Sequence, residues 1–336
     1  MSTFQNFCLL LALFAFINGC SSSKEATQQQ NKNYYSKTAE TAGLDRWLDE
    51  NFDLIVRIQS TVFYQTHNFA KDQNFMPSGL NEIDLKTIAE SSTIDNESRA
   101  GTAVMIAEAN DNYLLLTANH IVSYPDTLWH YRDRDSGVLS AVSVKVRDSF
   151  SLLTENNIGP IKPVATDSHR DLALMTTAFD LDDEPNPGTI RAGNSSELNW
   201  ADFVYAIGYP KGIKVISSGL VSLSERLKET TFTIDAPFNK GFSGGIILAV
   251  NNSTSEPEWV GMITSTTSDT EYLMTPGTIT QNNYTPEVPF NDSIFVERFN
   301  RINYGLTHTV SINEIKKFLD ENRDTLSNYG FGLHGF

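Results

Sequence analysis

The chain has 336 residues, of which 20% are charged and 40% hydrophobic, and it carries a formal net charge of −16. This composition is ordinary for a soluble globular protein with one large β domain or two smaller ones. The negative charge argues against nucleic-acid backbones and anionic membrane surfaces as partners, and its plainest explanation is solubility. The cysteines, Cys8 and Cys20, both lie near the N-terminus, so we expect no disulfide in the folded part.

The first twenty residues predict export from the cytoplasm. Residues 7–17 form an apolar run that is short for a membrane span but typical of a signal-peptide core, although no Lys or Arg precedes it. The following "INGC" resembles a bacterial lipobox, so we expect a signal peptide at 1–19, a lipid on Cys20 and a disordered polar tether at 20–43. A plain secretory signal is the alternative. Ser21 favours the outer membrane, in a periplasmic or surface-facing position of the bacterial cell envelope.

Short apolar segments follow the tether at regular intervals. Many of them alternate between apolar and polar residues, and turn sequences such as "ANDN" and "RDSG" separate some of them. We predict strands at 53–63, 101–109, 112–118, 139–148, 171–177, 203–210, 214–224, 231–235, 244–250 and 258–266. This pattern favours an all-β barrel or sandwich over alternating strands and helices.

Two helices and two long loops complete the predicted layout. At the C-terminal end, "SINEIKKFLDENRDTL" begins with Ser311 and has Glu314 three residues later, which is a capping-box arrangement followed by apolar residues at helical spacing. A shorter helix is expected at 43–52. The polar segment 64–98 and the Thr-, Asn- and Pro-rich segment 267–300 are interpreted as long loops.

The stretch "NKGFSGGIIL" at 239–248 places Ser243 between glycines, directly before an apolar run. Glycines allow tight turns and close backbone approach, so bare N–H groups beside this hydroxyl could hold an oxyanion. An ordinary Gly-rich hairpin turn is the alternative.

Two further polar residues lie at the ends of predicted core strands. His120 ends "YLLLTANH", and Asp171 begins the apolar run of "SHRDLAL". Taken singly, each has a structural explanation, as a histidine bonded to the backbone or a carboxylate that caps local N–H groups. Together with Ser243 they occur in the order His, Asp, Ser, which is the chain order of chymotrypsin-type triads.

These motifs resemble trypsin-like serine proteases, and most closely the bacterial HtrA-like (Deg) branch. "GTAVMIAEANDNYLLLTANHIV", "SHRDLAL" and "TIDAPFNKGFSGG" are similar to the His, Asp and Ser motifs of that family, and "WVGMITST" is similar to its substrate-binding strand. The resemblance implies two six-stranded β-barrels and a C-terminal helix within a protease domain at 44–330. The N-barrel would cover about 53–180, the C-barrel about 195–310 and the helix 311–326.

The resemblance also implies a role for each site residue. His120 would be the general base and then the general acid, Asp171 would orient it, and Ser243 would be the nucleophile. Backbone N–H groups of Gly241 and Ser243 would form the oxyanion hole, and Thr264 and Ser265 would line the substrate cleft.

The chain departs from the family pattern at several places. Phe242 and Asn119 precede the serine and the histidine, where smaller residues are common, and an enlarged loop is expected between 121 and 166. We expect neither a peptide-binding PDZ domain after the helix nor activation by a free N-terminus. Pro237 stands where trypsin has the acid of its specificity pocket, so we expect a small or medium apolar residue before the scissile bond.

The sequence leaves two main functional hypotheses. The first is a lipid-anchored serine endopeptidase of envelope or extracellular proteins, and the second is a catalytically silent lipoprotein that binds peptides or proteins. A purely structural envelope protein would make the three motifs a coincidence. We expect no cofactor and no metal, because the acids at 179–188 suit a solvated turn better than a Ca²⁺ site.

Overall fold

The computed structural model describes residues 34–39, 42–80, 83–133, 136–154, 158–177, 185–223, 231–276 and 294–333. The predicted signal peptide, Cys8, Cys20 and most of the tether lie outside the described residues. So do parts of the segments 179–188 and 267–300 that the sequence singled out.

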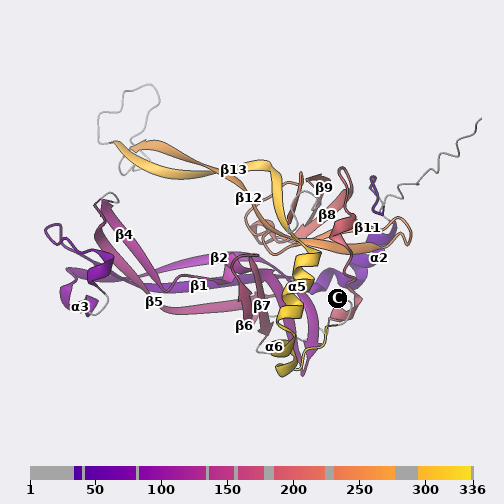
Figure 1. The fold of residues 1–336 in the computed structure, drawn as a ribbon, viewed down its shortest axis with the longest axis horizontal. Coiled ribbons are helices and arrows are strands. Elements are labelled where there is room, and N and C mark those ends of the chain that lie inside the picture. The colour runs from indigo at the N-terminus through magenta and orange to yellow at the C-terminus, as the bar shows by residue number, and fades with distance from the viewer. Residues whose placement is uncertain are drawn as a thin grey trace, which may run out of the picture. The chain divides into compact units, whose positions relative to one another are not determined.

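The N-terminal half of the described chain forms a closed antiparallel barrel (Figure 1). Its strands pair in the order β1–β2–β3–β7–β6–β5, pairing of β1 with β5 closes the ring, and β4 extends the sheet beyond β5. The strands are β1 (Ile55–Asn68), β2 (Ser91–Ala109), β3 (Asn112–Ala118), β4 (Thr127–Asp133), β5 (Val138–Leu153), β6 (Ile158–Asp167) and β7 (Leu172–Thr177).

The C-terminal half forms a second closed barrel in the order β10–β13–β12–β11–β8–β9. Its strands are β8 (Phe203–Gly208), β9 (Val215–Leu223), β10 (Thr231–Ile234), β11 (Ile246–Val250), β12 (Pro257–Pro276) and β13 (Ile294–Ser311). Two closed six-stranded antiparallel barrels, counted over the described residues, confirm the predicted all-β double barrel.

The strands that carry the site are buried on both faces. In β11, Ile247 and Ala249 belong to the core inside the second barrel, while Ile246 and Leu248 belong to the larger core that includes the first barrel and the C-terminal helix. Burial on both faces explains why β11 reads as a continuous apolar run and not as an alternation. It also gives the loop before Ile246 a rigid base.

Five helices accompany the barrels in the described part of the chain, and short 3₁₀ turns connect several strands. They are α2 (Ala42–Asn51), α3 (Leu85–Ile88), α4 (Asn119–Val122) and the C-terminal pair α5 (Ile312–Glu321) and α6 (Arg323–Asn328). As predicted, Ser311 is the N-cap of α5 and its side chain accepts a hydrogen bond from the Glu314 backbone N–H. The single predicted C-terminal helix is divided at Asn322, whose side-chain amide donates to the carbonyl of Phe318.

Both predicted long loops contain strand residues at their ends. Within 64–98, β1 continues to Asn68 and β2 already starts at Ser91, and the two pair over their whole shared length. Figure 1 shows β1, β2 and β5 running side by side away from β6 and β7. The exposed residues of β2 at 91–98 are polar except Ile94, so they lack the apolar alternation from which a strand is predicted.

The enlarged loop expected at 121–166 and the second predicted long loop at 267–300 need the same correction. The enlarged loop expected at 121–166 contains α4, β4, β5 and most of β6. In 267–300, β12 continues to Pro276 and pairs with β13 from Ile294 onward. These strands extend the sheets through cross-strand hydrogen bonds, and small buried clusters that include Leu139 and Val142 pack on the extension formed by β1, β4 and β5.

The predicted tether does not remain free up to residue 43. Tyr35 is fully buried and forms an isolated β-bridge with Asn251, and the Ser36 N–H donates to the carbonyl of Val250. Lys37 adds an ion pair with the buried Asp202 at 3.0 Å. The segment 34–39 therefore packs against the second barrel, and Tyr35 joins its hydrophobic core although the surrounding residues are polar.

Candidate active site

The sheet register brings His120 and Asp171 together. Ala118, the last residue of β3, pairs with Leu172, the first residue of β7, so the residues just beyond these strand ends are neighbours. The His120 backbone N–H donates to Asp171 Oδ1 at 2.8 Å, and His120 Nδ1 lies 2.7 Å from Asp171 Oδ2. Because a carboxylate can only accept, Nδ1 carries the proton and Nε2 presents its lone pair.

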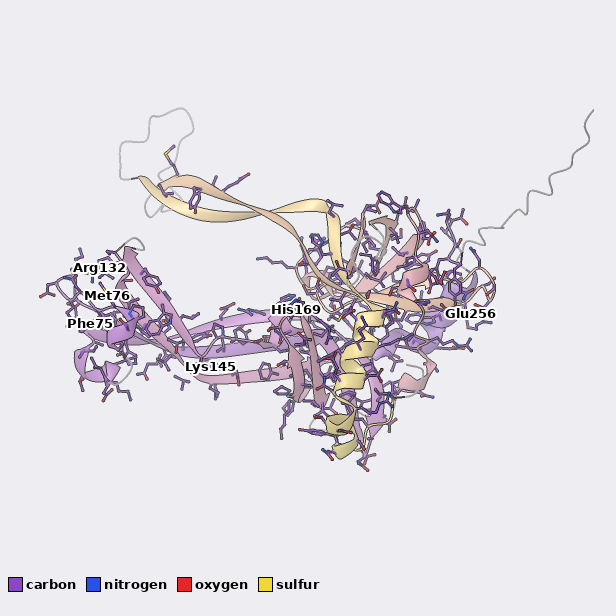
Figure 2. All side chains as sticks on the ribbon, in the orientation of Figure 1. Phe75, Met76, Arg132, Lys145, His169 and Glu256 are labelled. Carbon is purple, nitrogen blue, oxygen red and sulfur yellow. The ribbon has the colours of Figure 1, made fainter. Side chains whose placement is uncertain are left out.

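Asp171 is held in an uncommon backbone conformation. Its φ is +58°, a region that costs a non-glycine residue roughly 1–2 kcal/mol. In the preceding turn, Asp167 Oδ1 accepts the backbone N–H groups of His169 and Arg170. Figure 2 labels His169 in this turn. The conformation persists because these contacts fix the residues immediately before Asp171.

Arg170 fastens the same turn to the C-terminal helix. Its guanidinium donates to Glu314 at 3.0 Å and to Glu321 at 2.6 and 2.7 Å, in addition to Asp167 at 3.0 Å. The hydrogen bonds with Glu321 raise the pKa of Arg170 above its ordinary value. Helix α5 therefore helps to hold the turn that directly precedes Asp171.

The loop that carries Ser243 is fixed between the two barrels. The Thr102 N–H donates to the carbonyl of Ser243 at 2.8 Å, and Thr102 Oγ1 donates to the carbonyl of Gly241 at 2.8 Å. On the other side, the Gly244 N–H donates to the carbonyl of Ile263 in β12 at 2.7 Å. Ser243 is thus held by backbone contacts from both β2 and β12.

Two glycines in this loop are sterically required. Gly241 has φ +106°, and a Cβ there would lie 2.2 Å from the carbonyl oxygen of Tyr209. Gly244 has φ +84°, and a Cβ there would lie 1.9 Å from the carbonyl oxygen of Thr102. The glycines that the sequence places around Ser243 therefore allow backbone approach that no side chain permits.

The N–H groups of Gly241 and Ser243 make no hydrogen bond within the part of the chain that the structure describes. The carbonyl of Lys240 accepts the Lys211 N–H at 3.0 Å. In a trans peptide the carbonyl and the N–H point in opposite directions, so the Gly241 N–H is directed away from Lys211. These two donors are available to an oxygen that carries negative charge.

His120 and Ser243 line one cleft of about 740 Å³, together with Gly241, Thr264 and Ser265. Ser243 Oγ donates to the carbonyl of Thr264 at 3.0 Å. Among the described residues no hydrogen bond joins Ser243 to His120. All the predicted catalytic, oxyanion-hole and substrate-cleft residues therefore line this cleft, except Asp171. Asp171 is connected to the cleft by its hydrogen bond with His120.

Several residues that line the cleft could not be identified as site residues from the sequence. The lining includes Arg57, Glu97, Arg99, Lys211, Lys240 and Phe238, while Pro237 is exposed. Arg99 Nη1 donates to the carbonyls of His120 and Ser123 at 2.5 and 3.0 Å, and its guanidinium lies 4.2 Å from the centre of the Tyr124 ring. Only the pairing of β2 with its neighbours could have placed Arg99 beside His120.

Within the described ranges, no group of three or more His, Cys, Asp or Glu side chains is arranged to hold a metal ion. None of the helices in that part of the chain has the length and apolar character needed to cross a membrane.

Known proteins resemble this chain in sequence and in structure. A family model for the trypsin-like peptidase domain matches residues 101–261. The serine protease Do-like HtrA of Bacillus subtilis is 28% identical over 170 residues, which cover 47% of this chain and 32% of that protein. The chain thus spans about a third of the length of this relative.

Among solved structures, the active form of the Rv3671c protease from M. tuberculosis matches with a TM-score of 0.42 and 11% identity, over 84% of this chain and 86% of that one. Deg5 matches with a TM-score of 0.38 and 18% identity, over 68% of this chain and 87% of its own. The sequence matches and the two closed barrels show that the chain is similar to trypsin-like serine proteases, including one of the HtrA-like branch.

Proposed function

We propose that this chain is a serine endopeptidase that hydrolyses peptide bonds of envelope or extracellular proteins. His120, Asp171 and Ser243 would act as the catalytic triad. The observation that carries the proposal is the double contact of Asp171 with the backbone and ring of His120, in a cleft that Ser243 shares. The trypsin-like domain match over residues 101–261 supports the same reaction class.

The first half of the reaction follows from the positions of these groups. Asp171 keeps the proton on Nδ1, so Nε2 accepts the proton of Ser243 as Oγ attacks the substrate carbonyl carbon. Ser243 Oγ exchanges its hydrogen bond with the Thr264 carbonyl for one with His120 before it attacks. The imidazolium that forms is stabilised by the Asp171 carboxylate and then gives its proton to the leaving amine.

The N–H groups of Gly241 and Ser243 stabilise the oxyanion of the tetrahedral intermediate. Loss of one such donor typically costs about 3 kcal/mol of transition-state stabilisation. In the second half, a water molecule gives a proton to His120 and attacks the acyl-enzyme. The acid product then leaves, and the proton returns to Ser243.

A catalytically silent binding protein is the second candidate function. The bond from Ser243 Oγ to the Thr264 carbonyl favours it, since a serine that remains there is not activated by His120. The net contribution of one such hydrogen bond is only about 1 kcal/mol, so substrate binding can displace it. The endopeptidase is therefore the better supported candidate.

A fluorophosphonate probe, which reacts with activated serines, separates the two candidates. We expect a covalent adduct on the wild-type protein and none on Ser243→Ala. Ser149→Ala is the matched control, because Ser149 lies on β5 outside the cleft, and this variant should be labelled like the wild type. A wild-type protein that stays unlabelled supports the binding protein.

We also propose that the mature protein is attached to a membrane of the bacterial cell envelope by a lipid on Cys20. The sequence "INGC" and the polar segment behind it support this attachment. Incorporation of labelled palmitate by the wild type and by Cys8→Ser, but not by Cys20→Ser, would support it. Palmitate incorporation by Cys20→Ser would contradict it.

A further inference from the structure

The active-site cleft is rich in positive charge, although the whole chain is acidic. Its lining includes Arg57, Arg99, Lys211 and Lys240, with Glu97 as its only acidic residue among those described. The chain as a whole has 41 acidic and 25 basic residues. A cluster of cations in such a protein is a local feature that the overall composition does not explain.

Two oppositely charged residues of the cleft, Arg99 and Glu97, form an ion pair with each other. Arg99 Nε donates to Glu97 Oε1 at 2.8 Å, and Arg99 Nη1 is occupied by the carbonyls of His120 and Ser123. Glu97 and Arg99 therefore offset each other's charge. The other three basic side chains of the cleft are Arg57, Lys211 and Lys240.

Arg57, Lys211 and Lys240 form no ion pair and no side-chain hydrogen bond within the described part of the chain. Arg57 Nε is buried without a hydrogen-bond partner. A buried polar donor left without a partner is unfavourable. Because the three side chains line the cleft and have no partner among the described residues, they can donate to an anion there.

The backbone brings these three side chains to one place. The Lys211 N–H donates to the carbonyl of Lys240, which joins the turn at Pro210–Gly212 to the Ser243 loop. The Arg57 guanidinium packs over Gly212, where an added Cβ would lie 3.0 Å from Nη1. Lys211 itself has φ +53°, an uncommon conformation for a lysine. Three like charges grouped in this way repel one another until an anion joins them.

We propose that Arg57, Lys211 and Lys240 form an anion-accepting subsite that selects protein substrates with an Asp or Glu side chain close to the scissile bond. The subsite lies outside the position directly before that bond, which Thr264 and Ser265 are expected to contact. A carboxylate can accept two parallel hydrogen bonds from the arginine and further ones from the lysines. This inference rests on the proposed endopeptidase function and adds its substrate class.

Matched peptides test the subsite on the full-length chain. A peptide library first identifies a cleaved sequence, and each acidic position is then replaced by its amide, Asp by Asn or Glu by Gln. We expect kcat/KM to be about tenfold higher for the acid than for the amide at one position, as several partly exposed ion pairs would produce together. Higher salt should reduce this ratio because it screens exposed charges.

Variants of the three cations assign the preference to them. Lys240→Gln, Arg57→Gln and Lys211→Asn should each lower the acid-to-amide ratio, and Asn is chosen at position 211 because it tolerates positive φ. Lys240→Glu should bring the ratio below one. Lys162→Gln, at an exposed residue of β6 outside the cleft, is the control and should keep the wild-type ratio.

The outcomes separate this inference from the proposed function. A protein that cleaves peptides with a ratio near one, or with a ratio that the three variants leave unchanged, overturns the subsite and leaves the endopeptidase intact. A protein that cleaves no peptide and shows no Ser243-dependent fluorophosphonate labelling overturns the endopeptidase, and the subsite as a substrate selector with it.

Discussion

Arg170 Nε donates to Glu314 Oε2 at 3.0 Å, which ties the residue next to Asp171 to the C-terminal helix. The Glu314 side chain is only 5% exposed, and Lys317 lies 2.5 Å from its other oxygen. The position of Asp171 therefore depends on a helix that is remote from it in sequence.

Replacing Arg170 by methionine should destabilise the protein. Arg170→Met leaves the buried Glu314 with only its contact to Lys317, and removal of one partner from a largely buried pair costs about 2–4 kcal/mol. Arg323→Met removes the exposed pair with Asp320 and should cost less than about 0.5 kcal/mol. Urea unfolding measures both values, and equal losses would contradict the supporting role of Arg170.

The same cluster should make stability depend on pH. Burial alone would raise the pKa of Asp167, but the N–H groups of Arg170 and His169 and the Arg170 guanidinium outweigh it and hold the pKa below its ordinary value. A carboxyl with a lowered folded-state pKa adds stability that is complete above its unfolded pKa and is lost as the pH falls through the folded value.

Asp167→Asn lacks this contribution at every pH. The difference in unfolding free energy between wild type and Asp167→Asn should therefore be constant above about pH 5 and shrink toward about pH 3. Urea unfolding at several pH values measures it. A difference that grows as the pH falls would show that the pKa of Asp167 is raised, contrary to this account.

Gly244 should tolerate no side chain. Gly244→Ala places a Cβ 1.9 Å from the Thr102 carbonyl oxygen, so the loop must move or the barrels must separate, at a cost of at least about 3 kcal/mol. Gly137 also has positive φ, +71°, but has open space around it. Gly137→Ala should cost only about 1 kcal/mol. Thermal unfolding measures the loss of stability in both variants. Equal losses would show that positive φ alone, and not the contact with Thr102, requires glycine at position 244.

The strand pattern predicts an all-β fold, the family resemblance implies the double barrel, and each of the three motif residues gives a local signal. The apolar runs ending at Ala118, beginning at Leu172 and beginning at Ile246 mark core strands, and His120, Asp171 and Ser243 stand at their ends. Polar residues at the ends of buried strands can be recognised from the sequence alone. The order His, Asp, Ser of the three motifs then predicted that these residues act together.

The sheet extensions and the charged cleft could not be predicted in this way. Exposed residues of β2 such as Ser92 and Glu97 are held by cross-strand pairing with β1 and lack an apolar period. Arg57 and Lys240 come together only after both barrels have closed, through contacts between residues far apart in the chain. The buried Tyr35 lies in a polar segment whose composition predicted disorder.

Arg99 should position His120 through its backbone. Arg99→Met removes the two hydrogen bonds to the carbonyls of His120 and Ser123 and should lower kcat by about 10- to 100-fold, with a smaller effect on KM. Arg147→Met removes a guanidinium stacked on Phe63 on the sheet extension and should leave kcat unchanged. Peptide hydrolysis, measured on samples with matching circular dichroism, distinguishes the two, and equal kcat values would contradict the positioning role.

The measurement that tests the catalytic account most directly is kcat for peptide cleavage by Asp171→Asn. The amide cannot hold the His120 ring with its proton on Nδ1, and the loss expected for a serine protease triad is about 10⁴-fold in kcat. The double variant with Ser243→Ala should be no less active than Ser243→Ala alone, because the three residues act as one unit. An Asp171→Asn protein that keeps more than about a tenth of the wild-type value would contradict the triad.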